Sequence, residues 1–453
     1  MPGAPLPGLP VVSSVISDPA SVDAYRRDCA DLADTGQPYA VVRATCTDEV
    51  AETLRWASAH RVPVVTRGAG SGLSGGAAAI EGCLVLSLAP MDQILEISPD
   101  DLLAVVQPGV LNGDLNRAAE RHGLFYPPDP SSFEISTIGG NLATNAGGFR
   151  CLKYGVTRDS VLGLQVVLAD GRVIRTGSRT VKNVVGYDLT SLFVGSEGTL
   201  GVITEATVRL RPRPAHQPAT MVASFATLAD AGQAVSAIIR AGLDPSLLEL
   251  MDHASIGLIE DYRAMGLDRD AAALLIGQAD SPDARAQAED MASLAEGARA
   301  TFAAASTDPV EADMLLQARR LHYQAVEAAG QVLTEDVGVP RSRLPELLAA
   351  IEEIAARHGL LIATVGHAGD GNMHPAIVLP RDRPDATERA MRAADEICTL
   401  ALRLGGTISG EHGIGSLKRP WLSKQLGDET IAAHQAVRSA LDPLGILNPG
   451  KAL

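Results

Sequence analysis

The sequence has few cysteines, and they are not paired. Five of them are scattered along the chain with no Cys-x-x-Cys spacing: Cys29, Cys46, Cys83, Cys151 and Cys398. A disulfide framework, a thiolate zinc site and an iron–sulfur cluster each need paired or closely spaced cysteines, so this distribution argues against all three. Unpaired cysteines of this kind are expected in a protein of the reducing cytoplasm.

The sequence also lacks an excess of positive charge and a long apolar run. Lysine and arginine total 38 against 54 acidic residues, a formal net charge of −16, which argues against nucleic acid or an anionic membrane as a partner. No apolar stretch reaches membrane-spanning length, and residues 1–10 show no basic segment before an apolar core. We therefore expect a soluble, cytoplasmic protein without a transmembrane segment. Any contact with a membrane is expected to be peripheral and made through a partner.

A length of 453 residues exceeds what one hydrophobic core usually holds, so the sequence predicts two domains. A boundary is indicated by Arg211-Pro212-Arg213-Pro214, where two prolines stop a strand and the composition beyond becomes helical. The predicted domains are residues 36–214 and 215–453, in an α+β fold.

The periodicity of apolar residues predicts the elements of both halves. In the first half a helix is expected at 47–59, with Thr47 as its cap, and strands at 62–66, 84–88, 103–107, 164–168, 173–176 and 202–210. In the second half helices are expected from Pro309, from Pro345 to near Gly359, and at 386–404. Strands are expected there at 360–365 and 376–379.

Two histidines flank a glycine-rich segment in the second half. His367 and His374 are separated by Ala-Gly-Asp-Gly-Asn-Met, and Glu411-His412 follows further along. Two imidazoles and one carboxylate match a catalytic zinc site with an open position, and the remaining imidazole supplies a base. Both histidines are expected at a turn outside the core, and the alternative is that they are ordinary loop histidines. A metal-dependent hydrolase without a flavin is a competing hypothesis.

Three glycine-rich segments mark the first half. Residues 70–75 fit Gly-x-Gly-x-x-Gly after a strand, but the next strand follows too soon for the helix that a Rossmann site requires, and no Walker lysine is present. Such backbone can still bind pyrophosphate through its N–H groups, although a plain glycine turn is the alternative. Residues 127–148 and 194–204 repeat this chemistry. Three such segments favour a large dinucleotide ligand.

Together these motifs resemble the FAD-linked oxidases of the vanillyl-alcohol-oxidase/p-cresol-methylhydroxylase type, in the D-2-hydroxyacid dehydrogenase branch. The resemblance runs from about Pro38 to Lys451. It implies a two-part FAD-binding domain of the p-cresol-methylhydroxylase type, followed by an α/β substrate domain and a C-terminal cap.

The resemblance also implies which residues contact FAD. They are Arg67, Gly68, Ala69, Gly70, Ser71, Gly72, Gly75, Pro128, Asp129, Ser132, Ile138, Gly139, Gly140, Asn141, Asn145, Gly148, Glu197, Gly198, Gly201, Ile203 and Asn448. Relatives with covalent flavin often have a histidine in the first glycine segment. Because Ser71 stands near that place, non-covalent FAD is expected.

In the second half the resemblance assigns His367, His374 and Glu411 to a divalent metal, with zinc expected first and manganese or iron as alternatives. It makes His412 the catalytic base and Asn372 a neighbour of the substrate. Arg319 matches an arginine that clamps the substrate carboxylate; the alternative is a surface arginine on an amphipathic helix. Lys418 is expected to be solvated, although it could hold the Glu411-His412 loop.

The implied reaction is oxidation of a short D-2-hydroxy acid, D-lactate or glycolate, to the 2-oxo acid by hydride transfer to flavin N5. Thr334 stands where the D-2-hydroxyglutarate dehydrogenases have a lysine, which disfavours that substrate and leaves it as an alternative. A further alternative is the flavin subunit of a glycolate oxidase-type electron-transfer complex. Since the chain has no iron–sulfur or haem motif, a quinone, a cytochrome, an electron-transfer flavoprotein or a partner subunit must accept the electrons. A homodimer is a possible assembly.

Overall fold

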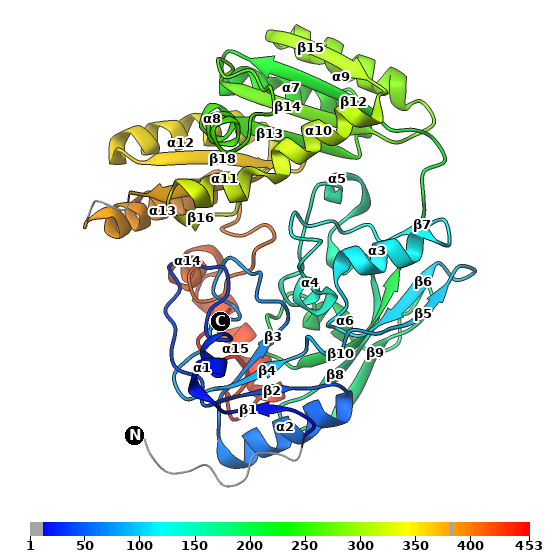
Figure 1. Ribbon diagram of the computed structural model, residues 1–453, viewed down its shortest axis with the longest axis vertical. Helices are drawn as coiled ribbons and strands as arrows, with labels where there is room; N and C mark the ends of the chain where they lie inside the picture. The colour runs from blue at the N-terminus through cyan, green and yellow to red at the C-terminus, as the bar shows by residue number, and fades with distance from the viewer. Residues whose placement is uncertain (1–11, 381–383) are drawn as a thin grey trace.

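The computed structural model describes residues 12–380 and 384–453, and residues 1–10, expected to carry no targeting signal, lie outside the described residues. Among the described residues, three larger β-sheets and one two-stranded sheet form two halves, one above the other in the view of Figure 1. The first half contains two of the larger sheets and the two-stranded sheet, and the second half contains the third large sheet. The expected α+β class, with the chain divided into two halves, is confirmed.

The first sheet has the order β1-β2-β4-β3 and contains parallel pairs on both sides of β4. Its strands are β1 (Val15–Ile16), β2 (Ala40–Arg43), β3 (Val64–Arg67) and β4 (Leu84–Ser87), with helices α1 (Pro19–Asp23) and α2 (Thr47–His60). The helix predicted at 47–59 is therefore present. Thr47 is not its cap, because Cys46 occupies that position and the Thr47 hydroxyl donates instead to Gln165 Oε1 at 2.7 Å.

The second sheet is antiparallel, with the order β5-β6-β10-β8-β9. It contains β5 (Ile94–Ser98), β6 (Leu103–Val106), β8 (Val161–Val167), β9 (Val173–Gly177) and β10 (Val202–Arg209), and a separate short pair joins β7 (Leu124–Phe125) to β11 (Arg211–Pro212). Between the strands lie α3 (Asn112–Glu120), α4 (Ile138–Thr144), α5 (Cys151–Tyr154), η1 (Thr157–Ser160) and α6 (Leu189–Phe193). The second glycine-rich segment is thus partly helical, since α4 begins at Ile138 with Thr137 as its cap.

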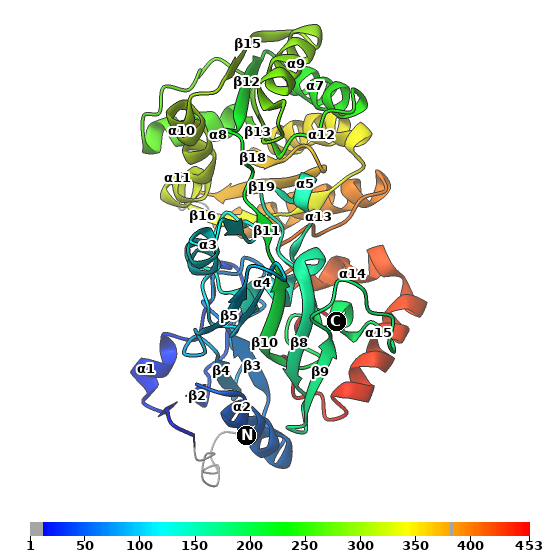
Figure 2. The ribbon, with the colours of Figure 1, turned by 90° about the vertical axis from the view of Figure 1, so that its right-hand side faces the viewer.

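The third sheet forms the second half, in the order β15-β12-β14-β13-β18-β19-β16, with β17 also paired to β19. Its strands are β12 (Ala219–Phe225), β13 (Leu247–Asp252), β14 (Ala273–Ala279), β15 (Ala300–Ser306), β16 (Gln331–Thr334), β17 (Val337–Gly338), β18 (Leu361–His367) and β19 (Asn372–Leu379). One face is covered by α7 (Leu228–Arg240), α9 (Ala284–Gly297), α12 (Leu344–His358, after η2, Arg341–Arg343) and α13 (Ala386–Arg403). The other is covered by α8 (His253–Tyr262), α10 (Pro309–Arg320) and α11 (His322–Ala329) (Figure 2). The predicted helices at Pro309, Pro345 and Ala386 correspond to α10, α12 and α13.

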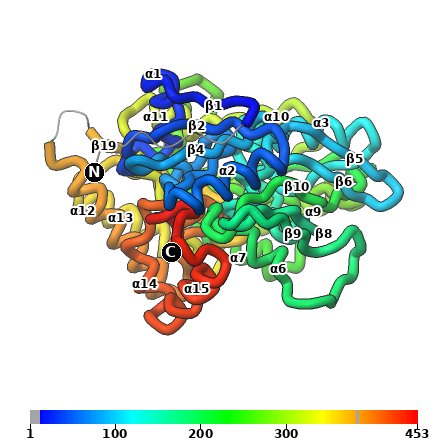
Figure 3. Tube along the Cα trace, turned by 90° about the horizontal axis from the view of Figure 1, so that it is seen from below, coloured from blue at the N-terminus to red at the C-terminus, as the bar shows by residue number. Residues whose placement is uncertain are grey.

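The C-terminal segment returns to the first half. Helices α14 (Arg419–Leu426) and α15 (Asp428–Leu441) lie in that half in Figures 1 and 2, and the red C-terminal trace runs beside the blue strands in Figure 3. Leu447 forms a parallel bridge with Val64. The Asn448 side chain donates to the carbonyls of Gly76 and Glu197, at 3.0 and 2.8 Å. The end of the chain therefore fastens the first glycine segment to the third.

No helix among residues 12–380 and 384–453 combines the length and the hydropathy that crossing a bilayer would require.

Candidate active site

The hairpin of β18 and β19 places two histidines on one face of the third sheet. His374 is paired with Val365, and His367 follows Val365 by two residues, so period-two alternation directs both imidazoles to the same side. The ring centroids are 5.1 Å apart and the rings are nearly perpendicular, at 81°. Both residues are buried within strands. The expectation of histidines at a turn outside the core is therefore wrong, because sheet pairing continues to the end of the hairpin.

Glu249 is a site residue that the sequence analysis missed. It lies on β13 directly opposite His367, is fully buried, and places Oε1 2.6 Å from His367 Nδ1. Its other oxygen forms an ion pair with Arg319 Nε at 3.0 Å. One carboxylate thus orients both the histidine and the arginine. The available signal was a glutamate between leucines in a strand with one other charged residue, Asp252 at its end, since a buried carboxylate requires partners.

Arg319 lies in the last turn of α10 and is 4% exposed, so the surface alternative is wrong. Its guanidinium lies 5.2 Å from the Phe149 ring centroid, and the residue lines the main cleft. Because Glu249 contacts Nε, the terminal nitrogens remain for another anion.

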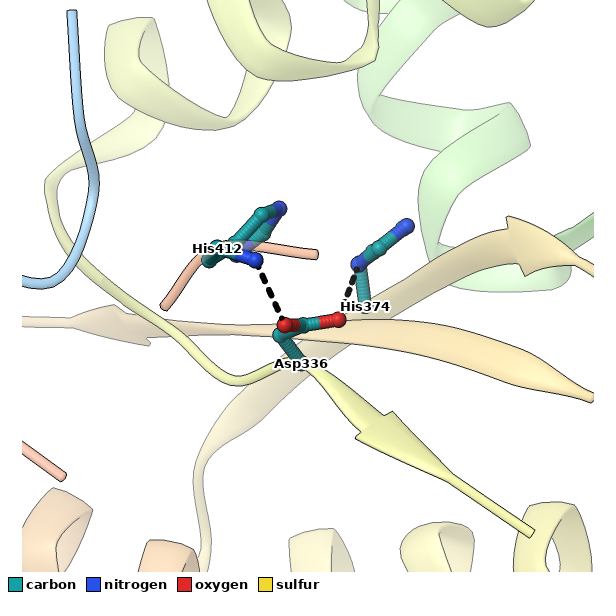
Figure 4. Close-up of side chains that lie close together, drawn as sticks. All are labelled: Asp336, His374 and His412. Carbon is teal, nitrogen blue, oxygen red and sulfur yellow. Dashed lines mark hydrogen bonds and ion pairs between the residues drawn. The ribbon is translucent and has the colours of Figure 1, made fainter. Parts of the chain in front are cut away.

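Asp336 holds the loop that carries Glu411 and His412. Its Oδ2 accepts the backbone N–H groups of residues 410, 411 and 412 at 2.8, 2.9 and 2.8 Å, and the Ser409 hydroxyl at 2.8 Å. Its Oδ1 accepts the Asn372 amide at 2.7 Å and lies 3.5 Å from His374 Nδ1. Figure 4 shows the carboxylate between His374 and His412. The position of this loop relative to β19 is therefore set by one buried acid.

Lys418 is also part of this framework. It is buried, donates to the Ile408 carbonyl at 3.1 Å, and places its ammonium 3.8 Å from Asp336 Oδ2. The expectation of a solvated lysine is wrong. A carboxylate buried this deeply needs a compensating cation, and the Lys418 ammonium is that cation. Lys418 also holds the loop through its hydrogen bond to the Ile408 carbonyl.

The nitrogens of the cluster converge on one oxygen. Glu411 Oε1 lies 3.4 Å from His367 Nε2, 3.3 Å from His374 Nε2 and 3.6 Å from His412 Nε2. Glu411 Oε2 and His374 Nε2 are buried without hydrogen-bond partners in the described part of the chain. Two imidazoles and a carboxylate whose ligand atoms lie within 4.8 Å of one another are suited to a divalent ion. The contact of Glu249 with His367 Nδ1 matches the outer-shell support that metal-binding histidines usually have.

The electrostatics of these residues also suit a cation. Burial lowers the pKa of His374 to about 4, so its ring is neutral at physiological pH and can act as a ligand. Burial opposes protonation of His367, but the carboxylates of Glu249 and Glu411 hold its pKa well above the usual value. Burial would raise the pKa of Glu411, yet the neighbouring His367 holds it well below the usual range. A metal ion would therefore replace the proton on His367.

A second grouping of possible ligands consists of Asp336, His374 and His412. Asp336 is less suited to coordination, because its oxygens already accept the loop N–H groups and the Asn372 amide. His412 stacks on His374, with centroids 4.8 Å apart and an interplanar angle of 15°, and it lines the cleft. This geometry favours His367, His374 and Glu411 as the ligands and leaves His412 beside them.

The main cleft, of about 350 Å³, is lined by both halves of the chain. Along the first glycine segment, no hydrogen bond from the backbone N–H groups of residues 69–76 is present among the described residues. Gly70 and Gly75 have positive φ, +76° and +77°, which L side chains rarely adopt. Eight unpaired N–H groups in the segment that borders the cleft fit a phosphate-bearing ligand, with no lysine required. The planar part of a flavin would find small residues at Gly140, Ala143 and Gly198.

Most of the predicted site residues line the cleft, and the others do not. Those that line it are Gly68, Ala69, Gly70, Ser71, Gly72, Ser132, Gly139, Gly140, Asn141, Glu197, Gly198, Gly201, Ile203, Arg319, His374, Glu411, His412 and Asn448. Those outside the lining are Arg67, Gly75, Pro128, Asp129, Ile138, Asn145, Gly148, His367 and Asn372.

Several residues of the second group have structural contacts. Ile138 lies in the apolar core of the first half, Asn145 accepts the Arg158 N–H at 2.8 Å, and the Asn372 amide faces Asp336 and the Val337 carbonyl. Glu197 lines the cleft, but its carboxylate accepts the N–H groups of Ile414 and Gly415, at 2.8 and 2.7 Å. It therefore ties the third glycine segment to the loop after His412.

Residues 38–177 match the family model of the FAD binding domain, and residues 214–452 match that of the FAD linked oxidases, C-terminal domain. The chain is 47% identical to the glycolate oxidase subunit GlcD of Bacillus subtilis, over 91% of this chain and 88% of that protein. It is 40% identical to the subunit of the same name from Escherichia coli (strain K12), over 92% and 83%. It is 38% identical to the D-lactate dehydrogenase of Archaeoglobus fulgidus, over 95% of each.

A solved structure of p-cresol methylhydroxylase with substrate bound shares the fold, with a TM-score of 0.80 and 18% identity, over 97% of this chain and 93% of that one. The expected p-cresol-methylhydroxylase type of architecture is confirmed. Since the model of the C-terminal domain alone matches more than half of the chain, and these relatives align over 91–95% of it, this protein belongs to the FAD-linked oxidases and is an oxidoreductase of that family.

Proposed function

We propose that this protein oxidises a short D-2-hydroxy acid, D-lactate or glycolate, to the 2-oxo acid, using non-covalent FAD and one divalent ion held by His367, His374 and Glu411. The observation that supports the proposal is that one cleft is lined by the glycine segment and by His374, Glu411 and His412 of the histidine–carboxylate cluster. Relatives named glycolate oxidase subunit and D-lactate dehydrogenase support the substrate class. When bound, the flavin supplies a hydride acceptor at N5, and the ion, zinc or else manganese or iron, lowers the pKa of a hydroxyl group.

The residues of the chain have separate roles in this proposal. Arg319 binds the substrate carboxylate through its terminal nitrogens, because its Nε is held by Glu249. His412 takes the hydroxyl proton, since its ring lines the cleft beside Glu411 and its backbone is fixed by Asp336. Asn372 acts through Asp336, whose Oδ1 it contacts. These contacts position Arg319 and His412 before the substrate arrives.

The flavin is expected to be released by acid. Ser71 lines the cleft in the first glycine segment, and residues 68–72 contain no histidine for attachment. Acid precipitation of the purified protein should leave the yellow colour in the supernatant, with the absorbance of free FAD. Colour that stays in the pellet would show a covalent bond and refute this part of the proposal.

A dye-linked substrate screen tests the proposed function. The isolated chain should reduce an artificial electron acceptor with D-lactate or glycolate, and more slowly with L-lactate. Preference for D-2-hydroxyglutarate would move the assignment to that alternative. A colourless preparation with hydrolase activity would support a metal-dependent hydrolase instead, and a flavin-containing protein that oxidises none of these acids would refute the proposal.

A second candidate is the flavin subunit of a glycolate oxidase-type complex. It is favoured by the relatives that carry the word subunit in their names. In either case a quinone, a cytochrome, an electron-transfer flavoprotein or a partner subunit must take up the electrons, because no Cys-x-x-Cys spacing for an iron–sulfur cluster is present. Cytoplasmic location, with peripheral membrane contact through such a partner, belongs to this proposal. Turnover with a dye by the isolated chain separates an independent enzyme from a subunit that needs its partners.

A further inference from the structure

The outer edge of strand β15 is exposed and uncharged. This strand, Ala300–Ser306, has seven residues and lies at one end of the large sheet of the second half, at the top of the molecule in Figure 1. Its sequence, Ala-Thr-Phe-Ala-Ala-Ala-Ser, contains no charged residue and no proline. Among the described residues, its backbone forms no hydrogen bond beyond the ladder with β12. The N–H and C=O groups on its outer side are therefore free to pair with another strand.

The other edge strands of the three larger sheets are protected. In the first sheet β1 has two residues, and the C-terminal segment covers β3. In the second sheet β5 contains Glu96 and β9 contains Arg175. At the opposite edge of the third sheet, the backbone N–H of Val332 on β16 donates to Asp31 at 3.3 Å. Short length, charge and cover are usual means by which edge strands avoid pairing, and β15 has none of the three.

We infer that β15 pairs with β15 of a second copy of this chain, antiparallel across a two-fold axis, so that the large sheet continues through a homodimer. A two-fold axis makes the strand its own partner, and antiparallel pairing satisfies the outer backbone groups of both copies at once. The pairing with β12 is regular from Phe302 to Ser306 and irregular before it. The axis therefore lies at Ala304, the centre of the regular part. The inference concerns assembly and does not depend on the proposed function.

The side chains of β15 suit this arrangement. Ala300 and Ala303 pack against the core that α9 covers, whereas Phe302 is 56% exposed. With the axis at Ala304, Phe302 of one copy lies opposite Ser306 of the other, and the two Ala304 methyl groups face each other. These small side chains allow the two strands to approach, and each phenyl ring is removed from water beside the strand of the other copy.

The charges at the two ends of the strand are complementary. Arg299 precedes β15 with 73% of its side-chain surface exposed, and the exposed Asp308 follows the strand. Antiparallel pairing brings the start of one strand beside the end of the other, so Arg299 of each copy approaches Asp308 of its partner. Arg299 also forms an ion pair with Asp230 of its own chain, and a guanidinium has enough donors for both carboxylates. A parallel arrangement would bring like charges together, so charge favours the antiparallel one.

The test measures the mass of the FAD-containing protein in solution by analytical ultracentrifugation across micromolar concentrations. The parent should sediment as a dimer. Ala304→Lys puts two ammonium groups opposite each other at the axis, so the dissociation constant of the dimer should rise by at least ~10-fold. Val173→Lys is the matched control, because Val173 is 44% exposed on the edge strand β9, and it should dimerise like the parent. Flavin content shows whether each variant is folded.

Ala304→Cys supplies a second, independent measurement. The β-carbons of directly opposite residues lie about 4.5–5.5 Å apart, close enough for a disulfide after a small shift. Mild oxidation should therefore join two chains at this position, whereas Val173→Cys and the parent, whose Cys29 and Cys46 are exposed, should stay unjoined. A parent that is monomeric at every concentration overturns the inference and leaves a strand of another protein as the occupant of this edge. A dimer that Ala304→Lys does not weaken, or that Ala304→Cys does not join, uses another surface and also overturns it.

Discussion

His412→Ala should reduce the rate of flavin reduction by substrate by ~10²-fold or more, the size expected for loss of a positioned base. The variant should keep its FAD and its metal. His412 lies beside the proposed ligands, with Nε2 3.6 Å from Glu411 Oε1, and its ring stacks on His374. Its backbone N–H, which Asp336 holds at 2.8 Å, is unchanged by the substitution, so the loop should keep its position. Substrate affinity should change much less, because Arg319 is retained.

The measurement is anaerobic stopped-flow reduction of the bound flavin at saturating substrate, together with the metal and FAD content. His434→Ala is the control histidine, since His434 is exposed on α15. A variant that reduces its flavin within a few-fold of the parent would eliminate His412 as the base. A variant that loses metal would instead make His412 a ligand, together with His374 and Asp336.

His374→Ala should lose the divalent ion while keeping FAD. His374 supplies a neutral nitrogen that has no hydrogen-bond partner in the described structure and points at Glu411. Removal of a ligand should weaken metal binding by more than the ~10–100-fold typical of an outer-shell partner. Flavin reduction by substrate should fall with it. Elemental analysis gives the metal content, and the visible spectrum of the flavin gives the FAD content.

Glu249→Gln is the matched comparison for this prediction. Glu249 contacts His367 Nδ1 at 2.6 Å but lies outside the proposed ligand set, so its loss should weaken metal binding by about 10–100-fold rather than abolish it. Competition with a chelator measures the difference between the two variants. If His374→Ala retains a full complement of metal and its activity, the metal site lies elsewhere.

Local sequence patterns were sufficient for many elements of the fold. The helix α10 begins at Pro309 with Asp308 as its cap, and α12 ends at His358 before Gly359, whose φ is +55°. Proline, capping residues and glycine determine helix ends through contacts within a few residues, so such signals can be read from the sequence. The missing helix after Gly75 was predicted in the same way, from the short distance to β4.

The sequence failed where a side chain depends on residues far along the chain. Lys418 was expected in solvent, yet it balances Asp336. Glu249 was overlooked, although β13 and β18, more than a hundred residues apart, bring it against His367. The hydrophobic periodicity of a single segment cannot predict such contacts, because they arise from the order of the strands in the sheet.

By itself the sequence determined the kinds of groups present: glycine-rich backbone for a dinucleotide, two imidazoles and a carboxylate for a cation, and no paired cysteines for a cluster. These groups can be identified from composition and motif spacing, because their chemical nature does not depend on how the chain folds. The tertiary structure alone decided which groups meet. Register across β13, β18 and β19 aligns Glu249, His367 and His374, and the return of the C-terminal segment brings Asn448 to the first glycine segment. The physical reason is that a buried polar side chain is stable only against a partner, and the sheet and the returning chain supply those partners from distant positions.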